Sequence, residues 1–292
     1  MPTRYSTSTI VTLLLSLCLI VTASLLSRPS QAAEMERPTK LTLWIHPYLP
    51  ATELVRRFTP LAEYLSSKLE IPVGIRIQQS YQAHIDFVGR DLADLAFMGP
   101  ASYVSMRLRY GNKPLLATVE ENNQPAFHGK IIVREDSPLS DLSQLKGESF
   151  AFGDPNSTMS YFVPRAMLKK AGVELKDFSS YDFLNSHHDV ALAVLGGFFS
   201  AGAVKDEVFL EYRERGLRAL ATSPPIPDHP FVARADLPPE LLFQLSRVML
   251  EINQDPKREH ILGNIKKNIT GLAPPDPAVY DALSEMMGSL NE

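Results

Sequence analysis

The sequence predicts a two-domain α/β protein in which a middle domain is inserted into an outer one. The chain has 292 residues, 45% of them hydrophobic, which is enough for about two domains of roughly 100–200 residues each. Short β-rich runs alternate with helical segments, as in a parallel or mixed sheet covered by helices. Two turn-rich stretches, at residues 120–127 and 223–230, interrupt this alternation.

The two stretches mark the expected crossings between the domains. The second one, SPPIPDHP at 223–230, is rich in proline, which stiffens a connection that must not collapse into either domain. The first one, EENNQPAF at 120–127, is polar. Two crossings mean that both chain halves build the outer domain. We therefore expect an outer lobe at residues 40–124 plus 226–292 and an inserted lobe at residues 125–225.

The first half of the chain has the order expected of a helix-covered sheet. Apolar or alternating runs predict strands at residues 41–45, 73–78, 95–98, 115–119 and 130–134. Apolar residues at helical spacing predict helices at residues 52–69, 81–88 and 101–110. In the first of these, Leu54, Phe58, Leu61 and Leu65 share one face.

The middle of the chain repeats the pattern, and the tail differs from it. Further strands are expected at residues 149–153, 181–184, 200–204 and 218–223. Helices are expected at residues 157–171 and 187–195, and in the tail at 238–253, 256–267 and 277–290. Because only helices are expected after residue 223, they would form a cap rather than a third sheet.

The first 32 residues have the layout of a secretory signal peptide. Arg4 precedes an apolar run at residues 10–26, and SRPSQAA then supplies the small residues that a signal peptidase accepts. Cleavage is expected between Ala32 and Ala33. An uncleaved membrane anchor is the alternative, since the apolar run is just short of a full bilayer span.

The composition excludes several classes of protein. Cys18 is the only cysteine and would leave with the signal peptide, which excludes disulfides, a cysteine nucleophile and thiolate metal sites in the mature chain. The formal net charge is −4, and no basic cluster is longer than Arg56-Arg57 or Lys169-Lys170. This pattern argues against nucleic acid as a partner, because phosphate-backbone binding needs a concentrated basic face.

The stretch GDPNSTMSYFVP at residues 153–164 leads from a strand into a helix. Its DPN tripeptide has strong turn chemistry, and Asn156 or Ser157 is then a good N-cap. The first turn of a helix has unpaired N–H groups and the positive end of the dipole, so it attracts an anion without basic side chains. Ser157, Thr158 and Ser160 add hydroxyl donors. The alternative is that these hydroxyls only cap the helix.

A second helix start of the same type follows in NSHHDVALAV, where Asn185, Ser186 and His187 come after another strand. In open α/β sheets ligands bind beyond the carboxyl ends of the strands, where such starts converge. Two convergent starts predict a pocket for an anion, with plain capping as the alternative role of His187. His187 and His188 are adjacent and point to different sides, which argues against a metal pair.

Several motifs together resemble the phosphate/phosphite/phosphonate solute-binding proteins of ABC transporters. These motifs are GDPNSTMSYFVPRAMLKKAG, SHHDVALAVLGG, AGAVKDEVF and SPPIPDHPFVAR, with further similarity in DLADLAFMGPASYV and IIVREDSPLSDLSQLKG. They cover most of residues 40–250, and in this order they are strongly specific. The resemblance implies a type II periplasmic binding fold, with two α/β lobes of mixed sheets, two hinge crossovers, and C-terminal helices capping the outer lobe.

The resemblance also implies roles for individual residues. Ser157 and Thr158 match the hydroxyl pair that grips the phosphonate in this family, and His187 matches a histidine that touches the same oxygens. Tyr81, in QQSYQAHI, matches a tyrosine from the outer domain. Glu207, in VKDEVF, matches an acid that receives the ligand's ammonium in aminoalkylphosphonate binders. The alternative role of Glu207 is a solvated surface acid.

The chain departs from the family pattern at several positions. Met159 and Ser160 stand where such binders usually read STSG, Met98 stands where an aromatic residue is expected, and His229 replaces an acid before a proline. Ser200 replaces a common aspartate. These changes leave the anion cradle intact but remove one of two carboxylates that would hold an amine.

The sequence therefore predicts a periplasmic protein that closes over a small phosphorus oxyanion and delivers it to an ABC permease in the inner membrane. The expected ligand residues are Tyr81, Tyr103, Ser157, Thr158, Ser160, His187, Glu207 and His229, with core packing as the alternative for Tyr103. No catalytic residue, metal or cofactor is expected, and the chain is expected to be a monomer. One alternative is a ligand sensor that partners a membrane sensor kinase. A hydrolase built on Asp154, His187 and Ser157 is disfavoured, because no GxSxG elbow accompanies them.

Overall fold

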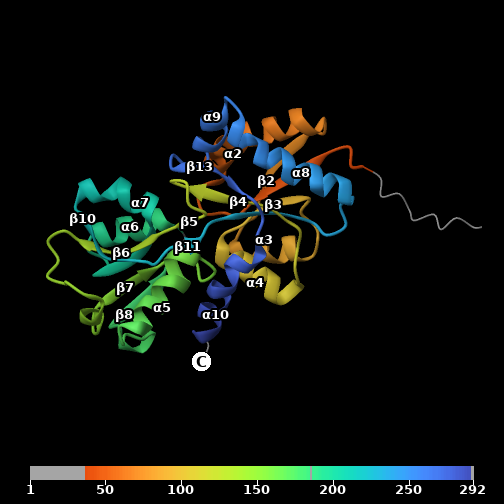
Figure 1. Cartoon of the computed structure of the whole chain (residues 1–292). Helices are drawn as coiled ribbons and strands as arrows, with labels where there is room; N and C mark the ends of the chain where they lie inside the picture. Colours follow the sequence, from red (N-terminus) through yellow and green to blue (C-terminus); the bar gives the residue numbers. More distant parts are fainter. Residues whose placement is uncertain (1–36, 185, 291–292) are drawn as a thin grey trace, which may run out of the picture. The chain divides into compact units, whose positions relative to one another are not determined.

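The computed structural model describes residues 37–184 and 186–290 of the chain. The predicted signal peptide, Cys18 and Asn185 lie outside the described residues. Figure 1 shows an outer and an inserted α/β lobe, each built on a mixed sheet. Two short antiparallel strands, β5 (Ala126–Phe127) and β11 (Ile226–Pro227), pair with each other at the two predicted crossings. The exact lobe boundaries at residues 124/125 and 225/226 stay a prediction.

The outer lobe contains a six-stranded sheet in the order β13-β4-β12-β3-β1-β2. Its strands are β1 (Leu41–Ile45), β2 (Val73–Ile77), β3 (Leu95–Phe97), β4 (Leu115–Glu121), β12 (Pro230–Ala233) and β13 (Ile269–Ala273). β1 is parallel to β2 and β3, whereas β12 is antiparallel to both of its neighbours. The sheet is therefore mixed, as predicted.

Helices cover both faces of this sheet. On one face lie α2 (Ala51–Leu69), α8 (Pro239–Glu251) and α9 (Arg258–Gly263), and on the other lie α3 (Tyr81–Gly89) and α4 (Pro100–Tyr110) (Figure 1). The predicted apolar face of α2 is confirmed, since Leu54, Phe58, Leu61 and Leu65 are all buried in the core between α2 and the sheet. Burial of this stripe holds α2, and with it the segment that leads from β1 into α2, against the sheet.

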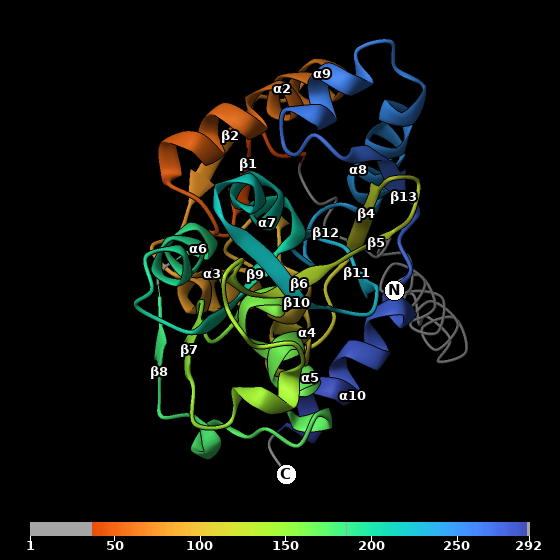
Figure 2. The ribbon, with the colours of Figure 1, turned by 90° about the vertical axis from the view of Figure 1, so that its left-hand side faces the viewer.

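The inserted lobe contains a five-stranded sheet in the order β10-β6-β9-β7-β8. Its strands are β6 (Gly129–Arg134), β7 (Ser149–Phe152), β8 (Ser180–Phe183), β9 (Ala201–Lys205) and β10 (Leu217–Thr222). Its helices are η1 (Leu142–Leu145), the π-helix η2 (Thr158–Phe162), α5 (Val163–Lys170), η3 (Leu175–Asp177), α6 (His187–Leu195), α7 (Asp206–Tyr212) and η4 (Arg213–Arg215). Figure 2 shows α6 and α7 together on one side of the sheet, with α5 on the other.

The prediction that only helices follow residue 223 is wrong. β12, with the sequence PFVA, lies between β3 and β4, and β13 pairs with β4 at the sheet edge. β12 is buried along its whole length and only four residues long, so it shows no alternation. β13 is interrupted by Gly271, which weakens its strand pattern. The seven-residue helix α7 was also not predicted.

The C-terminal segment caps the outer lobe and also reaches the inserted one. It contains η5 (Ile252–Gln254), η6 (Pro277–Tyr280) and α10 (Asp281–Ser289). α10 packs on α4, and its carboxyl end lies beside α5 (Figures 1 and 2). Arg165 donates to the carbonyl of Leu290 at 3.2 Å and Lys169 to that of Ser289 at 2.6 Å. These cations suit the negative end of the helix dipole. In the described ranges, no helix is both long and apolar enough for a transmembrane span.

Gly202 in β9 allows α6 to pack closely on the inserted sheet. A Cβ at this position would lie 2.7 Å from Cγ1 of Val190 and 3.0 Å from Cγ2 of Val194. Because this overpacks the core, Gly202→Ala is expected to lower the free energy of unfolding by about 1–3 kcal/mol, measured by urea denaturation. Gly288→Ala in α10 is the matched control, since its Cβ would meet nothing within 4 Å. Equal stability of Gly202→Ala and the wild type would contradict this packing.

Candidate functional site

A small cavity, with several polar side chains among its lining residues, lies between the two lobes at the carboxyl ends of strands β1, β7 and β9. It is lined by His46, Tyr48, Tyr81, Gly99, Phe127, Ser157, Thr158, Met159, His187, Lys205 and His229. Its volume is about 20 Å³, which is room for about one water molecule. A ligand of several heavy atoms would therefore fit only with the lining groups further apart. The position agrees with the rule that ligands bind beyond the carboxyl ends of strands in α/β sheets.

The turn after β7 brings two hydroxyl groups to this cavity. Ser157 is the N-cap of η2, and its Oγ accepts the N–H of Ser160 at 3.2 Å. Its own hydroxyl proton remains to be donated elsewhere. Oγ1 of Thr158 accepts the N–H of Ala101, at the start of α4 in the outer lobe, at 2.9 Å. The predicted helix start thus faces the cavity and contacts the opposite lobe.

His187 is neutral and presents a donor. It is buried at the start of α6, and its Nδ1 accepts the backbone N–H of Lys205 at 3.2 Å. With Nδ1 acting as an acceptor, the ring proton resides on Nε2, which can donate to a ligand. Burial, helped by the nearby charge of Lys205, lowers the pKa of His187 to about 3. The imidazole therefore stays uncharged at neutral pH.

His229 comes from the outer lobe, directly before β12. Its Nδ1 lies 2.6 Å from Oδ1 of Asp228, and its ring stacks on Phe97 with centroids 5.0 Å apart. Burial lowers the pKa of His229, while the Asp228 carboxylate opposes this shift. The bond to Asp228 fixes the orientation of the ring at the cavity.

Five of the eight predicted ligand residues line this one cavity: Tyr81, Ser157, Thr158, His187 and His229. The other three do not. Ser160 donates its hydroxyl to the carbonyl of Ala203 and so ties η2 to β9. Tyr103 is buried against Tyr280, with ring centroids 4.8 Å apart. Glu207 lies behind the cavity, in an ion pair with Lys205.

Lys205 is a lining residue that the sequence analysis missed. It ends β9 and is only 6% exposed. Its Nζ lies 2.6 Å from Oε2 of Glu207 and 4.5 Å from the ring centroid of Tyr48 in the outer lobe. A lysine at the end of a buried strand of small residues is the signal that could have found it, because that end of the strand faces the site.

The Glu207 carboxylate has a second cationic partner. Its Oε1 accepts from Arg57 of α2 at 3.0 Å, which links the two lobes. Burial alone would raise the pKa of Glu207, but Lys205, Lys266 and Arg57 lower it to about 2. Burial also lowers the pKa of Lys205, against the effect of Glu207. Because Glu207 touches two cations, the Lys205–Glu207 pair is ionised.

His46 is a second lining residue that was missed. It directly follows β1, is 2% exposed, and neither of its ring nitrogens has a hydrogen-bond partner among the described residues. Its ring stacks on Tyr48 with centroids 4.7 Å apart. Burial, with smaller contributions from His229 and His84, lowers its pKa well below the usual value. A buried neutral imidazole without a partner at the cavity wall is a candidate ligand contact.

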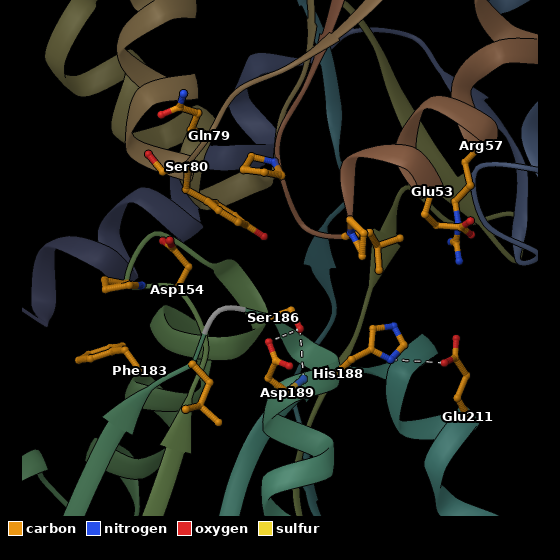
Figure 3. Close-up of a pocket in the computed structure, with 16 residues that line it drawn as sticks. Glu53, Arg57, Gln79, Ser80, Asp154, Phe183, Ser186, His188, Asp189 and Glu211 are labelled. Atoms are coloured by element: carbon orange, nitrogen blue, oxygen red, sulfur yellow. Dashed lines mark hydrogen bonds and ion pairs between the residues drawn. The ribbon is translucent and has the colours of Figure 1, made fainter.

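A larger groove between the lobes shares Tyr81 with the cavity and has a volume of about 890 Å³. In Figure 3, Gln79 and Ser80 of the outer lobe lie on one side of it, and Ser186 and Asp189 of the inserted lobe lie on the other. Ser186 caps α6 by accepting the N–H of Asp189 at 3.1 Å. Several carboxylates line the groove, among them those of Glu53, Asp154 and Asp189.

The arrangement lacks the contacts of a hydrolytic triad in the part of the chain that the structure describes. Oδ1 of Asp154 accepts the N–H of Asn156 at 2.7 Å, whereas His187 and Ser157 bond to the N–H groups of Lys205 and Ser160. Over the same residues, no cluster of three or more histidine or acidic side chains is suited to hold a metal ion.

Two lobes around a small cavity are the features of a solute-binding protein. The sequence model of the family "ABC transporter, phosphonate, periplasmic substrate-binding protein" matches residues 43–280, and the chain belongs to this family. The family resemblance of the sequence motifs is therefore confirmed.

Named relatives and a solved structure agree with this assignment. The "Probable ABC transporter phosphite binding protein PhnD1" of Prochlorococcus marinus (strain MIT 9301) is 28% identical over 233 residues, which are 75% of this chain and 77% of the relative. The "Phosphonates-binding periplasmic protein" of Escherichia coli (strain K12) is 25% identical over 251 residues, 82% of this chain and 73% of the relative. A structure of PhnD1 in complex with methylphosphonate has 25% identity and a TM-score of 0.78, and the match covers 87% of this chain and 99% of that one. The predicted type II periplasmic binding fold is confirmed.

Proposed function

We propose that this chain is a periplasmic solute-binding protein that closes over a small phosphorus oxyanion, such as a phosphonate, phosphite or phosphate, and delivers it to an ABC permease. One observation carries the proposal: the helix starts at Ser157 and His187 line the same cavity between the lobes. Lys205 adds a positive charge there. The relatives named for phosphite and phosphonates support phosphorus as the central atom of the ligand.

Each lining group has a part in holding the anion. The hydroxyls of Ser157 and Thr158 and Nε2–H of His187 are neutral donors from the inserted lobe, and Lys205 is the cation. Tyr81 contributes its hydroxyl from the outer lobe. The ligand favours the closed state only through contacts with both lobes, so the closure is a hinge motion at the β5–β11 crossovers.

The cellular setting belongs to the same proposal. The chain is exported by a cleavable signal peptide, acts as a monomer in the periplasm, and makes or breaks no bond in its ligand. The permease is the proposed receiver of the closed form, and a membrane sensor kinase is the alternative receiver. Neighbouring genes distinguish the two, because a permease and an ATPase favour transport and a kinase favours sensing.

Calorimetric titration of the exported chain with phosphate, phosphite, methylphosphonate and 2-aminoethylphosphonate tests the proposal. Binding of at least one of them is expected, and Thr158→Ala is expected to weaken it about tenfold, because one side chain and its bond to the opposite lobe are lost. Thr52→Ala, at an exposed position in α2, is the matched control and should bind like the wild type. No binding of any of the four anions would contradict the proposal.

A further inference from the structure

We infer that Lys205 restricts this site to anions that carry no ammonium group, because its own ammonium already holds the acid beside the cavity. The inference rests on the proposed function and specifies the class of substrate. It follows from three features: the partners of Glu207, the charges that line the cavity, and the position of Lys205 between them.

Both oxygens of the Glu207 carboxylate are engaged by cations of the protein. Oε2 lies 2.6 Å from Nζ of Lys205, and Oε1 lies 3.0 Å from a terminal nitrogen of Arg57. Arg57 in turn donates to Glu53 at 2.8 Å, so it is held in place from two sides. An ammonium on the ligand would have to displace one of these cations to reach Glu207.

The charges around the cavity favour an anion and oppose a cation. Of the described residues that line it, Lys205 is the only lysine or arginine, and none carries a carboxylate. Asp228 is a further buried acid, whose Oδ1 is occupied by the ring and the backbone N–H of His229. Its Oδ2 has no hydrogen-bond partner among the described residues, but Asp228 does not line the cavity. A cationic group in the cavity would therefore lie close to the Lys205 ammonium without a carboxylate partner of its own, and like charges brought together at a binding site oppose binding.

The side chain of Lys205 is held where it can meet a ligand. It is 6% exposed, and Nζ lies over the ring of Tyr48, across the cleft from β9. Tyr48 also lines the cavity and stacks on His46. The ammonium thus contacts the acid behind it, an aromatic face of the opposite lobe and the cavity itself. In effect, the protein supplies the positive group that an amine-bearing ligand would otherwise bring.

The decisive variant is Lys205→Met, which keeps the length and apolar stem of the side chain but removes the ammonium. It leaves Glu207 with Arg57 as its hydrogen-bonded cation and Lys266 as a further nearby charge, and opens Oε2 towards the space that Nζ occupied. The double variant Lys205→Met/Glu207→Gln removes the acid as well. Lys146→Met, at an exposed site in the same lobe, is the matched control.

Titration calorimetry with methylphosphonate and 2-aminoethylphosphonate, on the exported chain, gives the readout. The wild type and Lys146→Met are expected to bind methylphosphonate at least about tenfold more tightly than 2-aminoethylphosphonate. In Lys205→Met the affinity for methylphosphonate divided by the affinity for 2-aminoethylphosphonate is expected to fall at least about tenfold. Methylphosphonate should bind more weakly, and 2-aminoethylphosphonate more tightly, than in the wild type. In the double variant the gain for the amine should disappear. Thermal unfolding of each variant establishes that it is folded.

Three outcomes would overturn the inference. The first is a wild type that binds 2-aminoethylphosphonate as tightly as methylphosphonate. The second is a folded Lys205→Met variant in which the ratio of the affinities for methylphosphonate and 2-aminoethylphosphonate is the same as in the wild type. The third is a gain for the amine that persists in the double variant. If neither compound nor phosphite or phosphate binds to the wild type, the proposed function itself fails, and the inference fails with it.

Discussion

Ser157→Ala is expected to weaken methylphosphonate binding by about 10–100-fold and to lower the free energy of unfolding by about 0.5–2 kcal/mol. The hydroxyl has two roles. As the N-cap it accepts the N–H of Ser160 and sets the first turn of η2, and as a donor it faces the cavity. Alanine removes both, so the backbone N–H groups at the helix start lose their fixed direction together with the hydroxyl. Calorimetric titration and urea denaturation measure the two effects.

A control separates lost capping from lost binding. The carboxylate of Asp276 caps η6 by accepting the N–H of Ala278 at 2.9 Å, away from the cavity. Asp276→Ala should therefore lose a similar amount of stability while it binds methylphosphonate like the wild type. If the two variants bound the ligand equally well, Ser157 would be only a cap, which is the alternative that the sequence left open.

Glu207→Gln is expected to lower the free energy of unfolding by about 3–5 kcal/mol, because it leaves the buried Lys205 ammonium without its counter-charge. Arg57 loses its bond to the inserted lobe at the same time. Urea denaturation at neutral pH measures the loss. The double variant Lys205→Met/Glu207→Gln, which leaves no buried charge unpaired at this pair, should recover most of it. If Glu207→Gln were as stable as the wild type, the Lys205–Glu207 pair would not be buried as described.

The same pair gives stability a pH dependence at acid pH. The pKa of Glu207 is about 2 in the folded protein, against an ordinary value of 4.5. A lowered pKa means that the stabilisation is fully present above pH 4.5 and is lost as the pH falls towards 2. The shift corresponds to about 3 kcal/mol. Denaturation curves between pH 6 and pH 2 should therefore converge for the wild type and Glu207→Gln, and parallel curves would exclude the shift.

Local chemistry in the sequence was enough to predict the helix starts of the site. The turn formers before Ser157 and the Ser186 cap before His187 act through near neighbours, and both helices begin where expected. The β-α alternation likewise predicted most strands, because each shows its own apolar pattern. These signals depend on short stretches of chain.

Features that depend on distant partners could not be predicted in this way. Nothing near Ser160 indicates that its hydroxyl donates to Ala203 rather than facing the cavity. The partner of Glu207 stands two residues before it, yet only the fold shows that Lys205 turns inwards with it. His46 meets the other lining residues only after β1 enters the sheet beside β3. β12 is recognisable as a strand only from its place between β3 and β4.

The docking of α10 on α5 adds a further contact between the lobes, besides the two crossovers and the Arg57–Glu207 and Ala101–Thr158 bonds. Arg165 and Lys169 hold the final carbonyls of a helix that otherwise packs on α4. If the lobes separate, α10 can move with the inserted lobe, in which case its packing on α4 has to change. Otherwise Arg165 and Lys169 lose their hydrogen bonds to α10 and become hydrated instead. In the proposed hinge motion, the C-terminal helix would therefore contribute to the free energy needed to separate the lobes.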